Sequence, residues 1–327
     1  MAKPRVFTSC EIDFAHATLQ LLERSGYELI YRDPLPGWPD AQTRANLPGM
    51  QALLAGSERL AADTLDLADS LRIIARNGVG YDKVDLEECT RRGIMVTNTP
   101  GAMADAVADL AFALLLALVR QISVGDRFIK AGGYEVAMGE DLSAMTLGLV
   151  GCGRIGAEVV RRALGFKMRV LVCDPWVDPA RLKEMGATPS GLDELLAQAD
   201  AVTLHTPLTH ENRDLVNARF LGAMKRGSYL INTARGGLVD EPALIAALRS
   251  GHLAGAGLDC QVSEPPKGVS LELVQLENVV ATPHSGSKTL AARKRMALMA
   301  AQSIVDCLEG RVPEHLVNKE VLKRLGK

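Results

Sequence analysis

Short apolar runs alternate with segments of helical periodicity over the first 100 residues of the chain. The runs are rich in strand-forming residues, whereas the segments between them carry apolar residues every three or four positions. The expected strands are 5–9, 28–31, 51–55, 71–76 and 94–97, and the expected helices are 13–24, 60–67 and 86–92. The proline-rich stretch 34–39 is expected to form a surface loop. This alternation predicts a parallel sheet flanked by helices.

A different kind of segment follows before the alternation restarts. Residues 102–120 are apolar nearly all round, so they predict a helix that is buried in a core, between domains or in a dimer interface. Residues 121–145 contain four glycines and predict a helix with an irregular excursion. Such a segment often serves as a lid or a subunit arm.

From residue 146 onward, six further strands are predicted, with helices between them. The strands are expected at 146–150, 168–173, 201–205, 228–233, 255–260 and 278–282, and the helices at 154–164, 178–185, 192–198, 217–224, 241–250 and 287–309. Ser190 and Asn217 are suitable helix caps. Six strands with intervening helices fit a doubly wound sheet, in which ligands bind at the carboxyl ends of the strands. The chain is therefore predicted to be an α/β protein.

Three glycines follow the first of these strands at G-x-G-x-x-G spacing, namely Gly151, Gly153 and Gly156. The first permits a tight turn, the second lets the backbone approach a pyrophosphate, and the third lets the helix pack close to the strand. The N-terminus of that helix offers N–H groups and a positive dipole end to phosphates. Asp174 follows the next strand, 18 residues beyond the last glycine, where a carboxylate would hold the ribose hydroxyls.

The acid at Asp174 indicates NAD rather than NADP, because a carboxylate repels a 2′-phosphate and no Arg follows it directly. An ordinary βαβ unit with a glycine turn is the alternative interpretation. The preceding strand, the following helix and the acid occur together in this chain, and that combination favours dinucleotide binding.

Composition and charge narrow the classes of function. A chain of 327 residues with 47% hydrophobic and 23% charged residues predicts a globular protein of two domains. The net charge of −2 provides no electrostatic reason to bind nucleic acid or an anionic membrane. The six cysteines lack a C-x-x-C pair, the N-terminus lacks a secretory signal, and the longest apolar stretch, 110–119, is too short for a bilayer. We therefore expect a cytoplasmic protein with reduced thiols.

Polar residues follow several of the predicted strands and are the candidates for chemistry. Arg235 precedes two glycines at a strand end, where burial without an anion is costly, and its planar fork suits a carboxylate. Substrate binding is favoured over a surface salt bridge. His205 is a candidate base, although a lone His beside a proline is more often structural. The backbone of Thr206 and Pro207 suits packing along a cofactor.

Glu264 and His284 follow two later strands and form a usable acid–base pair. A His exchanges protons at neutral pH, and a carboxylate beside it favours the imidazolium and holds the ring in place. A metal site is disfavoured, because His284 has no Cys or His partner at metal spacing, and no G-x-S-x-G elbow supports a nucleophilic Ser. In the first half, the glycine-containing stretch 77–82 suits an anion such as a carboxylate, and a plain strand-to-helix turn is equally compatible with it.

These motifs together resemble one family. The chain carries GCGRIG followed by Asp174, then HTPLT, NTARGGLVDEPAL, GAGLDCQVSEPP and NVVATPHSGS, and in its first half NGVGYDKVDLEECTRRGIMVTNTPG. This set resembles the D-isomer-specific 2-hydroxyacid dehydrogenases, which include phosphoglycerate dehydrogenases and glyoxylate/hydroxypyruvate reductases. The likeness spans nearly the whole chain.

The resemblance implies a fold and a set of site residues. It implies two Rossmann-like or flavodoxin-like domains with doubly wound parallel sheets and an active site in the cleft between them. The substrate domain would comprise 1–100 and 288–327, and the NAD-binding domain 101–287 with a dimerisation helix at 102–120. The implied catalytic residues are Arg235, Glu264 and His284, and the implied substrate contacts are Val79, Gly80 and Arg235. The implied cofactor contacts are Gly151, Gly153, Arg154, Ile155, Gly156, Asp174, Thr206, Pro207, Thr233, Asp259 and Val107.

The activity implied by the resemblance is NAD(H)-dependent interconversion of a small 2-keto acid and its D-2-hydroxy acid. The substrate would be of the glyoxylate, hydroxypyruvate or phosphoglycerate type, and the enzyme a homodimer joined through the NAD-binding domain. Arg235 and the backbone of Val79 and Gly80 would hold the carboxylate. His284 would exchange a proton with the substrate oxygen, and Glu264 would keep the imidazole charged and oriented.

Two departures from the family pattern concern the pocket. Residues 260–263, CQVS, stand where a hydrophobic or acidic run is usual, and Ser287 stands where Gly or Ala is usual. Two rival interpretations remain open. The first is a formate-type dehydrogenase, but the pattern of such enzymes has an amide at the position of Glu264, so the carboxylate argues against it. The second is an NAD-sensing interaction protein of the corepressor type, which would share the fold and the triad.

Overall fold

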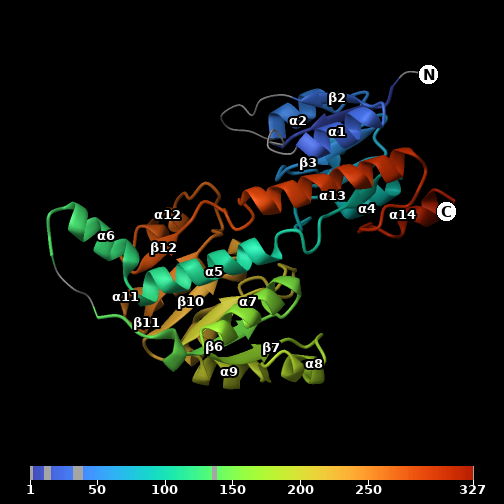
Figure 1. The fold of residues 1–327 in the computed structure, drawn as a ribbon. Helices are drawn as coiled ribbons and strands as arrows, with labels where there is room; N and C mark the ends of the chain where they lie inside the picture. The colour runs from blue at the N-terminus through green and yellow to red at the C-terminus, as the bar shows by residue number, and fades with distance from the viewer. Residues whose placement is uncertain (1–2, 11–15, 32–39, 135–137, 327) are drawn as a thin grey trace. The chain divides into compact units, whose positions relative to one another are not determined.

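The computed structural model describes residues 3–10, 16–31, 40–134 and 138–326. The chain divides into two compact units, each with its own parallel sheet. The first unit comprises Met1–Met103 and Lys288–Lys327, and the second unit comprises Ala104–Ser287. In Figure 1 the blue and red elements and the teal helix α4 belong to the first unit, and the green, yellow and orange elements belong to the second. The predicted α/β class with two parallel sheets is confirmed.

The first sheet has five strands in the order β2-β1-β3-β4-β5, and all neighbouring strands are parallel. The strands are β1 (Arg5–Thr8), β2 (Glu28–Tyr31), β3 (Ala52–Ala55), β4 (Ile73–Arg76) and β5 (Met95–Thr97). The helices are α1 (His16–Arg24), α2 (Asp40–Asn46), α3 (Ala62–Leu65), α4 (Leu86–Arg91), α13 (Leu290–Leu308) and α14 (Val321–Arg324). This strand order is that of flavodoxin-like doubly wound sheets.

Alternate residues of the first sheet face two different helical layers. Val6 of β1 and Leu54 of β3 belong to one buried cluster, which also contains Ala300 and neighbouring small residues of α13. Phe7 and Leu53 belong to the buried cluster on the opposite face. Because side chains alternate across a strand, a sheet covered on both faces needs apolar residues at consecutive positions. Helix α13 therefore brings the C-terminal segment of the chain into the core of the first unit.

The second sheet has seven parallel strands in the order β12-β11-β10-β9-β6-β7-β8. The strands are β6 (Thr146–Val150), β7 (Arg169–Cys173), β8 (Thr188–Pro189), β9 (Ala201–Leu204), β10 (Ser228–Asn232), β11 (Leu253–Leu258) and β12 (Val279–Ala281). The helices are α5 (Ala104–Val119), α6 (Ile122–Lys130), α7 (Arg154–Gly165), α8 (Pro179–Glu184), α9 (Leu192–Gln198), α10 (Ala218–Ala223), α11 (Glu241–Arg249) and α12 (Val269–Val274). The order reverses between β6 and β9, and a doubly wound sheet binds its ligand at such a switch point.

Helix α5 packs on the second sheet as a core helix of its own unit. Ten of its sixteen residues are buried. Glycines in β11 leave room for it, since a Cβ atom at Gly257 would lie 2.9 Å from Leu114 and one at Gly255 would lie 2.9 Å from Leu118. Among the described residues, no single helix is long and apolar enough to cross a membrane, although α5 and α6 together meet those criteria as a pair bent by 60°. Core burial thus accounts for most of the apolar surface of α5.

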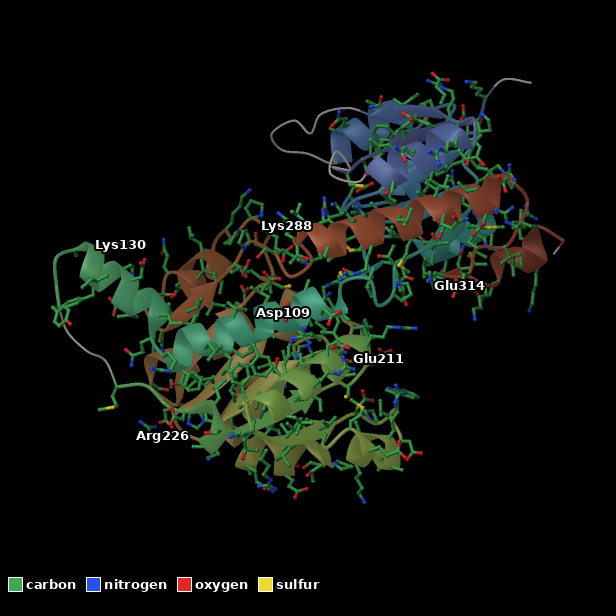
Figure 2. The ribbon with its side chains drawn as sticks, viewed as in Figure 1. Asp109, Lys130, Glu211, Arg226, Lys288 and Glu314 are labelled. Carbon is green, nitrogen blue, oxygen red and sulfur yellow. The ribbon has the colours of Figure 1, made fainter. Side chains whose placement is uncertain are left out.

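Helix α6 differs from α5, because none of its residues is buried. The side chains of Ile122, Val124, Phe128 and Ile129 are 55, 41, 40 and 54% exposed. Figure 1 shows α6 standing away from the sheet of its unit, and Lys130 marks its end in Figure 2. Part of the irregular excursion predicted after it, 135–137, lies outside the described residues.

Most predicted helices and strands are present within three residues of their expected bounds, but some predictions are wrong. The second sheet has seven strands rather than six, because β8 is only two residues long and offers no apolar run. The short helices α2, α12 and α14 were not predicted. Ser190 caps no helix, since α9 begins after Gly191, whereas Asn217 caps α10 as predicted. The predicted loop 34–39 lies outside the described residues.

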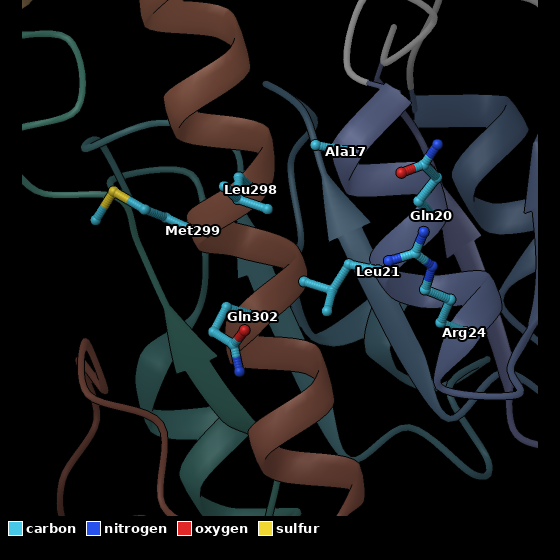
Figure 3. Close-up of a pocket in the computed structure, with 7 residues that line it drawn as sticks. All are labelled: Ala17, Gln20, Leu21, Arg24, Leu298, Met299 and Gln302. Carbon is cyan, nitrogen blue, oxygen red and sulfur yellow. The ribbon is translucent and has the colours of Figure 1, made fainter.

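A pocket of about 510 Å³ lies in the first unit between α1 and α13 (Figure 3). In Figure 3 the side chain of Leu21 points toward α13, which contributes Leu298 and Gln302. The other lining residues are Ala17, Gln20, Arg24 and Met299. Helix surfaces rather than strand ends form this pocket, and none of the predicted site residues lines it.

Candidate active site

The glycine turn follows β6 at the switch point of the second sheet. Gly151 has a φ of 91°, and a Cβ atom there would lie 2.7 Å from the backbone oxygen of His205. A Cβ atom at Gly156 would lie 2.7 Å from the oxygen of Gly151, so α7 packs directly on the turn. At Gly153, by contrast, a Cβ atom would meet nothing within 4 Å. A side chain at the first or third glycine would therefore clash with the backbone, whereas the space at the second glycine, before the helix, is open.

Helix α7 begins at this open space without a side-chain cap, because its N-cap residue is Gly153. Arg154 is exposed there, and Ile155 packs against the buried cluster below it. Asp174, at the end of β7, accepts a hydrogen bond of 2.6 Å from the N–H of Cys152. Its other oxygen accepts one of 2.8 Å from the N–H two residues further along. The structure thus brings the predicted acid beside the glycine turn.

Further predicted cofactor contacts lie near the carboxyl ends of the central strands. Thr206 and Pro207 follow β9, and Thr233 follows β10. The Thr233 hydroxyl is buried and has no hydrogen-bond partner among the described residues. Val107 of α5 is 3% exposed and would lie 3.3 Å from a Cβ atom at Gly286. The uncapped helix, the open glycine and the unsatisfied hydroxyl fit a dinucleotide, which offers partners to all three.

His284 and Glu264 form a hydrogen-bonded pair. The His284 Nδ1–H donates to the Glu264 carboxylate, with Nδ1 3.0 Å from both oxygens. Hydrogen bonds to Cys260 and to Glu264 raise the pKa of His284 to about 10, although burial acts in the opposite direction. The backbone of His284 has a φ of 49°, a conformation that costs a residue with a side chain on the order of 1 kcal/mol. The imidazolium is therefore the form present at neutral pH, and the backbone around it is constrained.

Asp259 holds the loop that carries His284. Its side chain is 1% exposed. One oxygen accepts hydrogen bonds from the Thr282 hydroxyl at 2.5 Å and the Ser285 N–H at 2.7 Å, and the other accepts from the Gly286 N–H at 2.9 Å. The family resemblance implies that Asp259 contacts the cofactor. In this structure it holds the loop that carries His284, a task that sequence reasoning missed.

The backbone carbonyl of Ala234 connects Arg235 to the histidine pair. Arg235 Nη1 donates to this oxygen at 2.7 Å, and the Cys260 thiol donates to it at 3.3 Å. Ligand-forming atoms of Cys260, Glu264 and His284 all lie within 4.8 Å of one another. The structure therefore brings Glu264 and His284 together with a thiol, and the Ala234 carbonyl links Arg235 to that thiol. His284 has no Cys or His partner at metal spacing in the sequence, but in the structure its ring lies beside the Cys260 thiol.

Glu241 fixes the loop 260–264, and sequence reasoning missed this role. Glu241 is 5% exposed, and its carboxylate accepts hydrogen bonds from the Val262 N–H at 2.9 Å and the Ser270 hydroxyl at 2.7 Å. A Cβ atom at Gly236 would lie only 2.1 Å from the backbone of the same loop. The only sequence signal was an acid in the first turn of a helix, which does not reveal that the acid is buried.

In the first unit, a polar network lies next to Val79 and Gly80. Arg76 is 7% exposed, and its Nε donates to the oxygen of Gly80 at 3.3 Å and its Nη1 to the oxygen of Glu58 at 3.4 Å. The Asn98 side chain donates to the oxygen of Val79 at 2.8 Å. Within the described ranges, the N–H groups of Val79 and Gly80 donate no hydrogen bond to the chain. The carbonyls of Val79 and Gly80 are thus held by side chains of the same unit, whereas their N–H groups are not used by the described part of the chain.

The contacts of His205 favour the structural interpretation of this residue over the catalytic one. Burial lowers the pKa of its ring to about 4, so the ring is neutral at pH 7. Its Nε2 lies 2.9 Å from the Thr203 hydroxyl. Its backbone oxygen forms the wall against which Gly151 turns.

Known proteins with similar sequences align with residues of both units. Residues 112–286 match the family described as D-isomer specific 2-hydroxyacid dehydrogenase, NAD binding domain. The chain is 41% identical over 330 residues to a glyoxylate reductase of Korarchaeum cryptofilum (strain OPF8), with 98% of each chain covered. It is 45% identical over 276 residues to a glyoxylate reductase of Pyrococcus furiosus, with 82% of each chain covered.

Solved structures show the same likeness in three dimensions. The D-lactate dehydrogenase from Aquifex aeolicus, complexed with NAD and lactic acid, matches with a TM-score of 0.83 and 30% identity, over 96% of this chain and 99% of that one. A glyoxylate reductase from Paecilomyes thermophila matches with a TM-score of 0.83 and 29% identity, over 97% and 99% of the two chains.

Proposed function

The chain belongs to the D-isomer-specific 2-hydroxyacid dehydrogenase family, and we propose that it reduces glyoxylate or a similarly small 2-keto acid. It is an NAD-dependent oxidoreductase that interconverts a 2-keto acid and a 2-hydroxy acid. Relatives named glyoxylate reductase, 41% and 45% identical, support a small substrate. Hydroxypyruvate and phosphoglycerate-type substrates present the same carboxylate and carbonyl, so they belong in any substrate panel.

The pair of His284 and Glu264, 3.0 Å apart, is the observation that carries this proposal, and Arg235 is linked through the Ala234 carbonyl to Cys260, which lies beside the pair. An imidazolium held at Nδ1 presents its Nε2–H as a proton donor. A guanidinium offers a planar fork to a carboxylate. Reduction of a 2-keto acid requires two things of the protein. A group must donate a proton to the carbonyl oxygen, and another must bind the carboxylate.

Each residue then has a defined task. Arg235 and the N–H groups of Val79 and Gly80 bind the substrate carboxylate, and Arg235 also polarises the carbonyl. The bound NADH supplies the hydride. His284 donates its Nε2 proton to the substrate oxygen, and Glu264 stabilises the charged ring and fixes its orientation. In the oxidative direction, neutral His284 accepts the hydroxyl proton.

The same unit is proposed to hold the cofactor. The N–H groups at the start of α7 and the open space at Gly153 suit the pyrophosphate, and the Asp174 carboxylate suits the ribose hydroxyls. The other proposed contacts are Gly151, Arg154, Ile155, Gly156, Thr206, Pro207, Thr233, Asp259 and Val107. Because a carboxylate repels a 2′-phosphate, NADH should be preferred over NADPH.

A cytosolic homodimer joined through the second unit is also proposed. The exposed apolar face of α6 supports it, since such a face is costly to leave in water. Reduced cysteines fit a cytosolic location, and none of the six, all within the described residues, forms a disulfide. Light scattering tests the assembly, and replacing Ile122 and Ile129 together by Asp should convert dimers to monomers. A wild-type monomer at micromolar concentration would contradict the dimer.

Steady-state rates with a panel of 2-keto acids, using NADH and NADPH in parallel, test the activity. His284→Ala should retain NADH affinity and lose about 10²–10⁴-fold in kcat, the usual contribution of general acid–base catalysis. His210→Ala, in an exposed histidine of the same unit, serves as the matched control and should keep the wild-type rate. Normal turnover by His284→Ala would remove this residue from the mechanism.

The role of Arg235 is tested separately. Arg235→Ala should raise KM for the keto acid and lower kcat, because the same group binds and polarises the substrate. Arg226→Ala, at an exposed arginine, is the control and should leave both constants unchanged. NADH binding without turnover of any keto acid would favour the NAD-sensing interaction protein, and oxidation of formate would favour the formate-type enzyme.

A further inference from the structure

The loops after β11 and β12 bring together three side chains with different metal-binding atoms. Cys260 and Glu264 follow β11, and His284 follows β12, the parallel neighbour of that strand. One ligand-forming atom of each residue lies within 4.8 Å of the other two. In the part of the chain that the structure describes, this is the one group of three or more such side chains that meets this distance.

We propose that Cys260, Glu264 and His284 bind Zn²⁺ or another thiophilic divalent cation, and that the bound metal reversibly inhibits the enzyme. Thiolate, imidazole and carboxylate are the ligand types of zinc sites. The sulfur ligand favours Zn²⁺ and Cd²⁺ over Mg²⁺ and Ca²⁺, which prefer oxygen. The inhibitory consequence rests on the proposed function, in which His284 donates the proton. A metal ion at Nδ1 would take the place of the Nδ1 proton. The Nε2–H of the resulting neutral, metal-bound imidazole is a much weaker acid than that of the imidazolium, so reduction would stop until the metal leaves.

The distances suit a tetrahedral ion. Metal–ligand bonds of about 2.0–2.3 Å place neighbouring ligand atoms about 3.3–3.6 Å apart. His284 Nδ1 and the Glu264 carboxylate are already 3.0 Å apart, and the whole group lies within 4.8 Å, so small side-chain rotations close the site. The side chains of His284 and Glu264 are 45% and 31% exposed, which leaves a path for the ion and a position for a water ligand.

The backbone around the three ligands is already held in place. The Cys260 thiol lies 3.3 Å from the oxygen of Ala234, and the loop beyond it is fixed by Glu241. Asp259 fixes the loop that carries His284. Prior fixation lowers the entropic cost of binding a ligand. Cys260 also begins the CQVS segment, in which this chain departs from the family pattern, so zinc sensitivity should follow this cysteine rather than the fold.

Metal binding is measured first, without substrate. The full chain is freed of metal with EDTA, the chelator is removed, and Zn²⁺ is titrated in competition with a chromogenic chelator. We expect one Zn²⁺ per chain, and with Co²⁺ a thiolate charge-transfer absorption. Cys260→Val should weaken Zn²⁺ binding about 100-fold and abolish that absorption, because the sulfur ligand is lost. Melting temperature and NADH affinity show that the variant is folded.

Cys307→Ser is the matched control. Cys307 is 2% exposed, as Cys260 is, and its thiol also lies on a backbone carbonyl, that of Arg72. This variant should bind Zn²⁺ and Co²⁺ as the wild type does. Equal Zn²⁺ affinity in Cys260→Val and the wild type would overturn the proposed site, as would the absence of Zn²⁺ binding by the wild type.

Inhibition is measured second, as keto-acid reduction with NADH at increasing Zn²⁺, with the metal-free rate of each variant as its own reference. Zn²⁺ should inhibit the wild type and Cys307→Ser, EDTA should restore the rate, and Mg²⁺ should have no effect. Cys260→Val should need about 100-fold more Zn²⁺. Unchanged zinc sensitivity in Cys260→Val would overturn the proposal. If Zn²⁺ binds through Cys260 but no keto acid is reduced, only the proposed function fails; if keto acids are reduced and no Zn²⁺ binds, only the metal site fails.

Discussion

The two sheets of this chain follow the same pattern of parallel strands, but they differ at their carboxyl edges. In the first sheet, buried polar side chains fill the edge. The Ser9 hydroxyl donates to Glu58 at 2.5 Å, and the guanidinium of Arg76 lies 4.0 Å from the same carboxylate. In the second sheet, the edge carries a glycine turn and open space at Gly153.

This difference assigns different tasks to two similar folds. A filled edge can offer a ligand its loop backbone, which is the role proposed for the N–H groups of Val79 and Gly80. An open edge can admit a large ligand such as a dinucleotide. Each edge nevertheless contains a buried acid. The Glu58 carboxylate contacts Ser9 and Arg76 at the first edge, and the Asp259 carboxylate holds the loop of His284 at the second. Function therefore depends on the loops at the strand ends rather than on the sheet itself.

Filling the open edge should have the largest effect. Gly156→Ala places a Cβ atom 2.7 Å from the oxygen of Gly151, and such overpacking typically costs about 1–3 kcal/mol. It should lower the melting temperature and weaken NADH binding more than about 100-fold. In Gly153→Ala the added Cβ atom has no protein atom within 4 Å, so the melting temperature should stay at the wild-type value. Only NADH affinity should fall, because the Cβ atom would occupy space proposed for the pyrophosphate. Thermal melts and NADH fluorescence titrations decide this, and normal NADH binding by Gly153→Ala would contradict the assigned site.

The acid–base pair of the open edge should show itself in the pH profile. The pKa of His284 is raised to about 10 by hydrogen bonds to Cys260 and Glu264. Reduction needs the protonated ring, so kcat should stay constant through neutral pH and fall as pH rises through about 10. In Glu264→Gln the pKa of His284 should drop, and kcat at pH ~9 should fall at least about tenfold below the wild type. An unshifted profile of kcat against pH would show that Glu264 does not control the ring.

Acid should lower the free energy of unfolding of the second unit through His205, which lies against the glycine turn. Burial lowers the pKa of His205 to about 4, whereas the unfolded chain protonates this ring near pH ~6.5. The stability conferred by the neutral ring is complete above that pH and is lost as pH falls toward 4. The loss at pH ~5 should be about 2 kcal/mol. Urea unfolding at pH ~7 and ~5 measures it, and His205→Gln should remove this part of the pH dependence. An equal loss in the variant would assign the effect to other groups.

The filled edge should give the smallest effect, confined to substrate binding. Arg76→Lys removes the Nε donor to the oxygen of Gly80 and should raise KM for the keto acid about fivefold, as expected for one hydrogen bond. The Kd for NADH should not change, because the second unit is proposed to hold the cofactor. Arg91→Lys, at an exposed arginine of the same unit, is the control. A change in NADH affinity would show that the two edges do not divide the work in this way.

The architecture was largely predictable, because strand and helix periodicities are local. β2 and α9 match their predicted bounds without error, and the chain position of each catalytic candidate at a strand end was foreseen. The errors are short elements such as β8 and α12, where two to six residues give no periodic signal.

The site was predicted residue by residue but not as an arrangement. Nothing in the spacing of Cys260 and His284 indicates that their side chains meet, because that proximity depends on the register of β11 with β12. The supporting roles of Glu241 and Asp259 were equally hidden, since an acid in a helix turn or at a strand end reveals neither its burial nor its donors.

The sequence by itself determined the two parallel sheets, the glycine turn at Gly151 to Gly156, and the types of side chain that end the strands, because these depend on residues close together in the chain. Only the tertiary structure decided that Ala234 connects Arg235 to Cys260, and that hydrogen bonds to Cys260 and Glu264 raise the pKa of His284. Hydrogen bonding and acidity depend on distances of a few ångströms between residues far apart in sequence, and packing alone sets those distances.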